Sequence, residues 1–174
     1  MKFTARSIVF IAAVLFLIGL PLWAQTATLE RIVDGDTIIV QLNHQRERVR
    51  LIGIDTPEST VNERARRVSR KYNEDLESMV AQGLRAKAFV VDLIRPGDEL
   101  RLETDVRSRD DYQRILAYVY LHDGRMLNEI LVSEGFAYPL TVPPNVRHAK
   151  RFTKLFGEAR RSKRGLWGDE HSPK

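Results

Sequence analysis

The stretch TLERIVDGDTIIVQLNHQRERVRLIGI, residues 28–54, decides the fold because it contains three runs in which apolar and polar side chains alternate. The runs cover residues 28–33, 37–42 and 47–54, and a period of two is typical of strands buried on one face. Only short turns separate them, and Asn43-His44 provides one of these turns. Three strands joined by short turns predict an antiparallel meander.

The middle of the chain contains an arginine-rich stretch followed by one clear helix. Residues 59–72 are polar, include five basic side chains, and fit either a loop or a marginal helix. A helix is predicted to begin at Asn73, a good N-cap residue, because apolar residues then recur at helical spacing. Pro96 and Gly97 end this helix, and Gly83 weakens its centre.

The last part of the chain predicts two more strands and two more helices. Alternation indicates strands over residues 100–106 and 115–121. A short helix is predicted over residues 128–134, capped by Asn128, and a last helix contains the apolar residues of 152–159. Five strands with a helix after the third strand are the order of an oligonucleotide-binding barrel, the OB-fold. The predicted class is therefore α+β, with a five-stranded OB-fold barrel and three helices.

The N-terminal segment, residues 1–24, differs in composition from the rest of the chain. Two basic residues come first, residues 8–22 are nearly all apolar, and Ala24 offers a small side chain for cleavage. This pattern predicts a secretory signal peptide, and hence a secreted or periplasmic protein. The alternative is a retained anchor that attaches the protein to a membrane through residues 7–24. In either case residues 25–174 are long enough for a single domain with its own core.

The composition narrows the chemistry that the chain can perform. It has 28 Lys and Arg against 23 Asp and Glu, and this mild excess alone is weak evidence for a nucleic-acid partner. It has no cysteine, which excludes disulfides, thiolate metal sites and a cysteine nucleophile. Its four histidines show no metal-ligand spacing. Oxygen ligands are thus the natural choice for any metal ion.

Two short acidic motifs stand at the edges of the predicted strands. One is DGDT at residues 34–37, and the other is RLIGIDTPE at residues 50–58. Carboxylates that converge from two segments can hold a hard divalent cation, and a neighbouring arginine can bind a phosphate through two parallel hydrogen bonds. Together these are the parts for metal-assisted phosphodiester cleavage. Taken alone, each motif also fits a structural turn, and Glu58 also fits a turn cap or an ion pair with an arginine of residues 59–71.

Five motifs follow one another along the chain. They are DGDT at 34–37, RLIGIDTPE at 50–58, DYQR at 111–114 with LAYVY at 116–120, NE at 128–129 with GFA at 135–137, and GLW at 165–167. In these motifs the chain resembles the thermonucleases, the staphylococcal-nuclease-like family. The resemblance implies a five-stranded OB barrel with three helices, and it implies calcium-dependent hydrolysis of DNA and RNA.

The resemblance also implies a metal site. By position, Asp36 and Asp55 match the two carboxylates that bind Ca²⁺ in the family, and the backbone carbonyl of Thr56 matches a third ligand. Asp34 matches a nearby acidic residue that supports the metal site without being a firm ligand. The stretch after Glu58 is longer and richer in arginine here than in the family.

The remaining implied roles concern the phosphate and the attacking water. Glu58 matches the glutamate that orients or deprotonates the water, and Arg50 and Arg114 match the two phosphate-binding arginines. Tyr112 is a candidate for a hydrogen bond to a phosphate. Gln113 stands where the family usually has glycine.

Two other classes of function compete with this interpretation. The first is a non-catalytic nucleic-acid-binding OB domain, but such relatives lack the carboxylate and arginine set that is complete here. The second is a membrane-anchored surface protein whose basic helices bind anionic lipid or polymer. On the catalytic interpretation DNA and RNA are the substrates, the protein is a monomer, and no obligate protein partner is expected.

Overall fold

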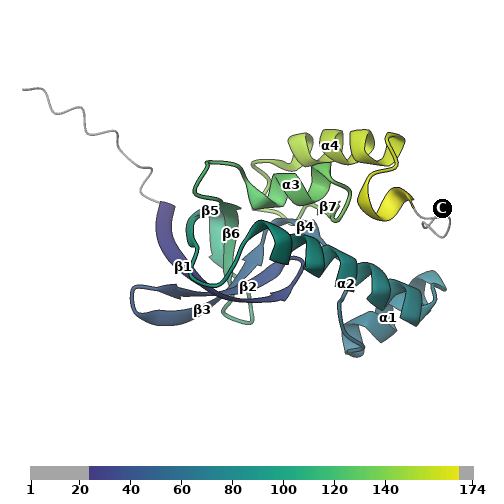
Figure 1. Cartoon of the computed structure of the whole chain (residues 1–174), viewed down its shortest axis with the longest axis horizontal. Coiled ribbons are helices and arrows are strands. Elements are labelled where there is room, and N and C mark those ends of the chain that lie inside the picture. The colour runs from purple at the N-terminus through teal and green to yellow at the C-terminus, as the bar shows by residue number, and fades with distance from the viewer. Residues whose placement is uncertain (1–23, 169–174) are drawn as a thin grey trace, which may run out of the picture.

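Within residues 24–168, which the computed structural model describes, the chain forms seven strands, four α-helices and one 3₁₀ helix (Figure 1). In chain order the elements are β1 (Ala24–Asp34), β2 (Thr37–Leu42), β3 (Gln45–Leu51), β4 (Gly53–Asp55), α1 (Glu63–Tyr72), α2 (Leu76–Leu93), β5 (Glu99–Arg109), β6 (Ile115–Tyr120), α3 (Leu127–Ser133), β7 (Tyr138–Leu140), α4 (Ala149–Arg161) and η1 (Gly165–Gly168). Apart from Ala24, the predicted signal peptide lies outside the described residues. None of the described helices is long and apolar enough to cross a membrane.

Five of the strands close into a barrel in the order β1-β2-β3-β6-β5. Strands β3 and β6 run parallel, whereas the other neighbours in the barrel run antiparallel. The alternation read from the sequence sends Ile38, Val40, Val49 and Leu51 into the interior, where all four are buried. The predicted α+β class with a five-stranded barrel is confirmed. The two short strands β4 and β7 pair with each other outside the barrel and were not predicted as a sheet.

The third predicted strand, residues 47–54, is wrong as one continuous element. Strand β3 ends at Leu51, and β4 begins at Gly53, whose φ of 80° turns the chain. A Cβ at this glycine would lie 2.6 Å from the ring of Phe152, so the turn also lets α4 pack closely. The alternation therefore ends at Gly53, because of its backbone conformation and its close contact with Phe152.

The helical part differs from the prediction in number and in its caps. The arginine-rich stretch contains a regular helix, α1, so there are four α-helices among the described residues where three were predicted. Asn73 does not begin the long helix; it ends α1 in the left-handed conformation, and Asp75 caps α2 by accepting the N–H of Ser78. Asparagine suits both positions, because it accepts N-cap hydrogen bonds and tolerates the left-handed region.

Asn128 is the second cap that was assigned wrongly. Helix α3 has Met126 at its N-cap without a side-chain hydrogen bond, and Asn128 is fully buried inside its first turn. Its side chain accepts the N–H of Val119 at 2.9 Å and donates to the carbonyl of Ile52 at 2.9 Å. Asn128 thereby satisfies backbone groups at the break between β3 and β4, where the ladder is interrupted.

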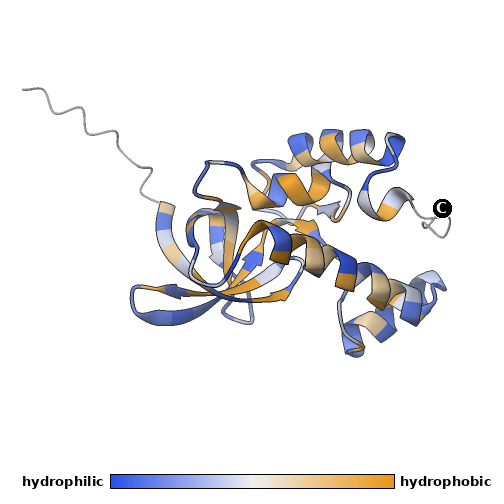
Figure 2. Cartoon of the chain, viewed as in Figure 1, coloured by the Kyte–Doolittle hydropathy of each residue, from blue (hydrophilic) through white to orange (hydrophobic). Residues whose placement is uncertain are grey.

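The helices lie on one side of the barrel (Figure 1). Helix α2 runs from the barrel toward α1, and α3 and α4 pack together above it. Figure 2 shows α3 largely in the hydrophobic colour and the outer turns of α4 in the hydrophilic colour, as expected for an inner and an outer helix. At the centre of α2, a Cβ on Gly83 would lie only 2.2 Å from the carbonyl oxygen of Glu58. This contact places α2 directly behind the segment that follows β4.

Candidate active site

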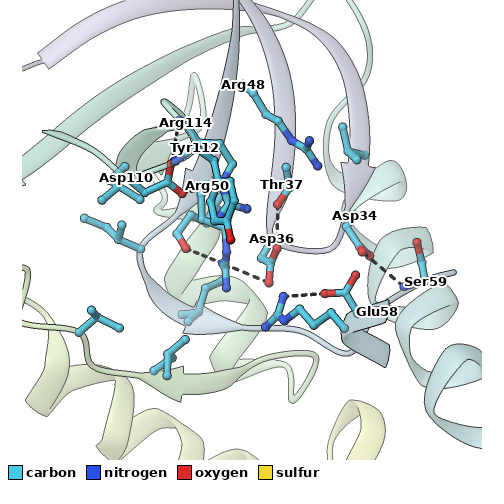
Figure 3. A pocket seen from close by; sticks show the side chains of 18 of the residues that line it. Asp34, Asp36, Thr37, Arg48, Arg50, Glu58, Ser59, Asp110, Tyr112 and Arg114 are labelled. Atoms are coloured by element: carbon cyan, nitrogen blue, oxygen red, sulfur yellow. Dashed lines mark hydrogen bonds and ion pairs between the residues drawn. The ribbon is translucent and has the colours of Figure 1, made fainter. Parts of the chain in front are cut away.

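Asp36 and Arg50 meet because the pairing of β2 with β3 places Thr37 opposite Arg50. Arg50 Nη1 lies 3.1 Å from Asp36 Oδ2 and donates to the carbonyl of Leu51 at 2.8 Å. Asp36 Oδ1 accepts the hydroxyl of Thr37 at 2.9 Å (Figure 3). Asp36 and Arg50 are 3% and 8% exposed, so the barrel wall holds this ion pair out of water.

The second acidic motif joins the first through the same arginine. Arg50 Nη2 donates to Asp55 Oδ1 at 2.7 Å, and the backbone N–H of Thr56 donates to Asp36 Oδ2 at 3.0 Å. The hydroxyl oxygen of Thr56 is buried over Gly35 and has no hydrogen-bond partner among the described residues. Two segments that are twenty residues apart in sequence therefore converge, as the sequence predicted, with Arg50 between their carboxylates.

Glu58 lies at the edge of this cluster and is held from α1. Arg64 Nη1 lies 2.6 Å from Glu58 Oε1, and Arg64 Nη2 lies 2.6 Å from Asp55 Oδ1. Asn62, the N-cap of α1, donates to Glu58 Oε2 at 2.7 Å. The ion pair between Glu58 and an arginine of residues 59–71, left open by the sequence, is thus present. Arg64 itself was missed, because nothing in the sequence distinguishes it from the other arginines of that stretch.

Carboxylates outnumber cations in the cluster. Its four carboxylates face two guanidinium groups, and the members are Asp34, Asp36, Asp55, Glu58, Arg50 and Arg64. Burial raises the pKa of the Asp34 carboxyl, and the charges of Asp36 and Glu58 raise it further. Burial also raises the pKa of Asp55, although Arg50 and Arg64 act to lower it. With all four carboxylates ionised, these six side chains carry two more negative than positive charges.

The donor chemistry also fits a hard divalent cation. Among the described residues that line the pocket in front of the cluster there is no histidine or cysteine, so the side chains there offer a metal ion oxygen atoms. Within residues 24–168, however, no three Asp, Glu, His or Cys side chains are already gathered around one point. The predicted ligand set contains two carboxylates, those of Asp36 and Asp55, and the backbone carbonyl of Thr56. Both carboxylates are engaged by arginines, and Arg64 provides the positive charge between Asp55 and Glu58.

Arg114 and Tyr112 come from the connection between β5 and β6. Arg114 donates from Nε to Asp110 Oδ2 at 2.6 Å, and its guanidinium carbon lies 5.7 Å from the centre of the Tyr112 ring. Tyr112 is 83% exposed. Gln113, at the position where the family usually has glycine, adopts a φ of 62°, in the left-handed region that glycine enters without strain. The turn that presents Arg114 thus keeps the backbone shape that a glycine would favour.

One pocket of about 1070 Å³ connects these groups. Six of the eight predicted site residues line it, namely Asp34, Asp36, Arg50, Glu58, Tyr112 and Arg114. In Figure 3, Tyr112 and Arg114 lie on the same side of Asp36 as Arg50, whereas Asp34 and Glu58 lie on the other side. Asp55 and Thr56 are joined to the pocket by their hydrogen bonds to Arg50 and Asp36.

Further cations line the same pocket and were not assigned to it from the sequence. They are Arg31, Arg48, Arg64, Arg67, Lys87 and Arg107. They come from β1, β3, α1, α2 and β5, so their convergence depends on tertiary structure rather than on any local motif. A pocket with acidic groups at its floor and cations around them suits a polyanion that approaches a bound metal ion.

Comparisons with known proteins show which family the chain belongs to. The staphylococcal nuclease homologue family matches residues 48–169. The thermonuclease of Staphylococcus hyicus is 30% identical over 145 residues, which cover 83% of this chain and 77% of that protein. The thermonuclease of Staphylococcus intermedius is 36% identical over 138 residues, covering 79% and 73%. The micrococcal nuclease of Shigella flexneri is 33% identical over 172 residues, covering 92% and 84%.

These matches confirm the predicted enzyme class, a nuclease. The chain belongs to the staphylococcal nuclease homologue family, and the resemblance read from its motifs is confirmed. The family match begins at residue 48, so Asp34 and Asp36 precede it. Their place in the site rests instead on the pairing of β2 with β3 and on the contacts of Asp36 with Arg50 and Thr56.

Proposed function

We propose that this chain is a calcium-dependent phosphodiesterase that hydrolyses DNA and RNA by attack of water on phosphorus. The observation that carries the proposal is the junction of Asp36 and Asp55 through Arg50, at the floor of a pocket lined by cations. A phosphodiester is anionic and gains charge at its equatorial oxygens during hydrolysis, so catalysis needs fixed positive charge and an activated water.

We assign the metal site to Asp36, Asp55 and the carbonyl oxygen of Thr56. All three are hard oxygen donors, and the excess negative charge of the cluster favours a divalent cation. When bound, Ca²⁺ would neutralise charge on the phosphate and orient the attacking water. Asp34 supports the site from the end of β1, where it accepts the N–H of Gly35 at 3.0 Å and faces the N–H of Ser59 at 3.4 Å.

Glu58 is the group that we assign to the water. Its carboxylate follows Pro57, and its side chain is 15% exposed, so it faces the pocket without being buried in the barrel. A carboxylate in this place accepts a proton from water or holds the water in line with the phosphorus. For this step, the Oε1 atom that now contacts Arg64 is directed to the water.

Arg50 and Arg114 are assigned to the phosphate. Their planar guanidinium groups donate two parallel hydrogen bonds to phosphate oxygens, which a lysine cannot do. Within the described part of the chain, Arg114 donates a side-chain hydrogen bond only from Nε, to Asp110, so the N–H groups of its two Nη atoms remain for a ligand. Tyr112 stands beside Arg114 and is exposed enough to reach a phosphate through its hydroxyl.

We also propose that the protein acts outside the cytoplasm, as a secreted or periplasmic enzyme. This rests on the basic start and the apolar run of residues 1–24 and on no structural observation. If the segment is retained, the same enzyme is anchored at the membrane surface.

The test is cleavage by purified protein lacking residues 1–24, on DNA and on RNA, with calcium and with excess chelator. We expect both polymers to be cut with calcium and neither with chelator. Asp55→Asn should abolish most cleavage, whereas Asp92→Asn, an exposed charge change on α2, should leave it unchanged. Full activity in chelator would contradict the metal assignment, and binding of nucleic acid without cleavage would indicate a non-catalytic OB domain.

A further inference from the structure

Arg64 occupies an unusual place among the cations of the site. Its two Nη atoms contact two different carboxylates, Asp55 and Glu58, each at 2.6 Å. One of these is a proposed metal ligand, and the other is the proposed base. The Asp55 oxygen that Arg64 contacts, Oδ1, also accepts Arg50 at 2.7 Å. A single guanidinium therefore bridges the groups that metal binding and water activation both require.

Arg64 is more exposed than Arg50, and this difference decides which of the two arginines a metal ion can displace. The Arg50 side chain is 9% exposed, grows from the barrel wall and is tied to the carbonyl of Leu51. The Arg64 side chain is 40% exposed, grows from the first turn of α1, and makes its described contacts only with carboxylates. Arg64 can therefore leave into water by rotating its side chain, whereas Arg50 cannot leave without opening the barrel wall.

Opposite charge holds Arg64 between Asp55 and Glu58 while no divalent ion is bound. Two crowded carboxylates gain from any cation between them, and a divalent ion competes for the same oxygen atoms. A divalent ion bound by the Asp55 carboxylate therefore competes with Arg64, the more exposed of the two arginines that contact this carboxylate.

We propose that Arg64 is an internal counter-cation of the metal site, which neutralises Asp55 and Glu58 until a divalent cation displaces it. The proposal rests on the proposed function, because it takes Asp55 as a metal ligand. Displacement frees Glu58 Oε1 for water, so Arg64 couples metal binding to exposure of the base. It also lowers the affinity of the site for the cation, since the ion pairs with Arg64 must be broken first.

The test is calorimetric titration of calcium into metal-free protein lacking residues 1–24, without nucleic acid. We expect Arg64→Gln to bind calcium about five- to tenfold more tightly than wild type, the range set by partly exposed ion pairs. Arg67→Gln is the matched control. Arg67 lies on the same helix and lines the same pocket, and its substitution by Gln removes the same charge. It should change the calcium affinity less than twofold.

Melting temperatures give a second readout that does not depend on activity. In chelator, Arg64→Gln should melt below wild type because Asp55 and Glu58 lose their shared cation, and saturating calcium should raise its melting temperature by more than that of wild type. Arg64→Lys keeps the charge but loses the planar fork whose two Nη atoms each contact one carboxylate. Its calcium affinity should therefore lie between that of wild type and that of Arg64→Gln. This variant serves if Arg64→Gln does not fold.

Two results overturn the proposal, and they are distinguishable. If wild type binds calcium through Asp55, as shown by loss of binding in Asp55→Asn, and Arg64→Gln and Arg64→Lys bind equally well, then Arg64 is no competitor and the proposed function stands. If neither wild type nor either Arg64 variant binds calcium, the metal site itself is wrong, and the proposed function fails with the inference.

Discussion

Two regions of the molecule meet at one oxygen atom, Asp55 Oδ1, and they hold it differently. The barrel wall, β2 with β3, brings Arg50 to this atom through strand register and keeps the arginine buried. The segment of residues 59–72 brings Arg64 to the same atom through a surface helix and leaves the arginine 40% exposed. The comparison teaches that one side of the site is set by the fold, whereas the other side is set by side-chain contacts that water can replace.

The largest effect is expected for Glu58→Gln, on the side of the 59–72 segment. Glutamine keeps the size but cannot take a proton, so cleavage in a single turnover should slow by about 10²–10⁴, the usual range for a general base. Calcium should still bind, and the melting temperature should fall only modestly through loss of the ion pair to Arg64. Glu63→Gln removes a neighbouring exposed charge and is the control.

This result separates catalysis from structure on that side of the site. A normal cleavage rate with a lowered melting temperature would mean that Glu58 serves only to hold α1 through Arg64 and Asn62. Glu58 would then have no role in catalysis, and its contact with Arg64 would be a structural ion pair.

A smaller effect on turnover, joined to a clear effect on stability, is expected for Arg50→Lys. Lysine keeps the charge but cannot contact Asp36, Asp55 and the Leu51 carbonyl together. Turnover should fall by about 10²–10³, and the free energy of unfolding should fall by roughly 1–3 kcal/mol because buried hydrogen bonds are lost. Chemical denaturation and single-turnover cleavage on the same protein measure the two quantities.

Arg114→Lys is the matched variant, because it makes the same change in the turn between β5 and β6. Arg114 is tied to Asp110 and is less buried than Arg50. Turnover should again fall, while the free energy of unfolding should change by no more than about 0.5 kcal/mol. Equal losses of stability in the two variants would show that burial of Arg50 in the barrel wall adds nothing to its contribution to the free energy of unfolding.

The smallest effect concerns Asp34, which ends β1 and faces Ser59, and so belongs to both regions. Burial raises its pKa above the ordinary value of 3.8. The folded protein then binds a proton there more tightly than the unfolded chain, so ionised Asp34 destabilises the metal-free fold, and this loss disappears as the pH falls toward 3.8. Asp34→Asn should therefore be more stable than wild type at neutral pH in chelator, with an advantage that shrinks on acidification.

Chemical denaturation of both proteins from neutral pH to pH 3.8 tests the direction of this pKa shift. The contributions of the other titrating groups cancel in the difference between the two free energies of unfolding. Asp92→Asn controls for the loss of one negative charge. A difference between Asp34→Asn and wild type that stays constant with pH would show that Asp34 has the same pKa in both states.

The barrel wall could be predicted from the sequence because its causes are local. A period of two over β2 and β3 fixes which side chains enter the core, and a tight turn fixes the register that brings Thr37 opposite Arg50. The meeting of Asp36 with Arg50 follows from these two facts. The hydrogen bond from the Thr56 N–H to Asp36 was not predicted, since no periodicity brings residues 36 and 56 together; the resemblance to a family implied only that Asp36 and the Thr56 carbonyl share a metal site.

The other region could not be predicted because its signals are ambiguous until tertiary contacts are known. Asn73 and Asn128 both looked like helix caps, yet one ends a helix in the left-handed region and the other is buried in hydrogen bonds with the barrel. Arg64 is one of five basic residues in the 59–72 stretch, and only the orientation of α1 selects it. Gly83 looked like a weak point of a helix, although the structure gives it a packing role.

Gly83 has a consequence for how random mutagenesis of this protein would be interpreted. Any side chain there would collide with the carbonyl of Glu58 at 2.2 Å and with that of Pro57 at 2.7 Å. In a library sorted by nuclease phenotype, position 83 would tolerate almost no replacement and would cluster statistically with Glu58, despite having no functional group. A conservation map alone would thus mark as part of the catalytic machinery a residue whose whole contribution is the absence of a side chain.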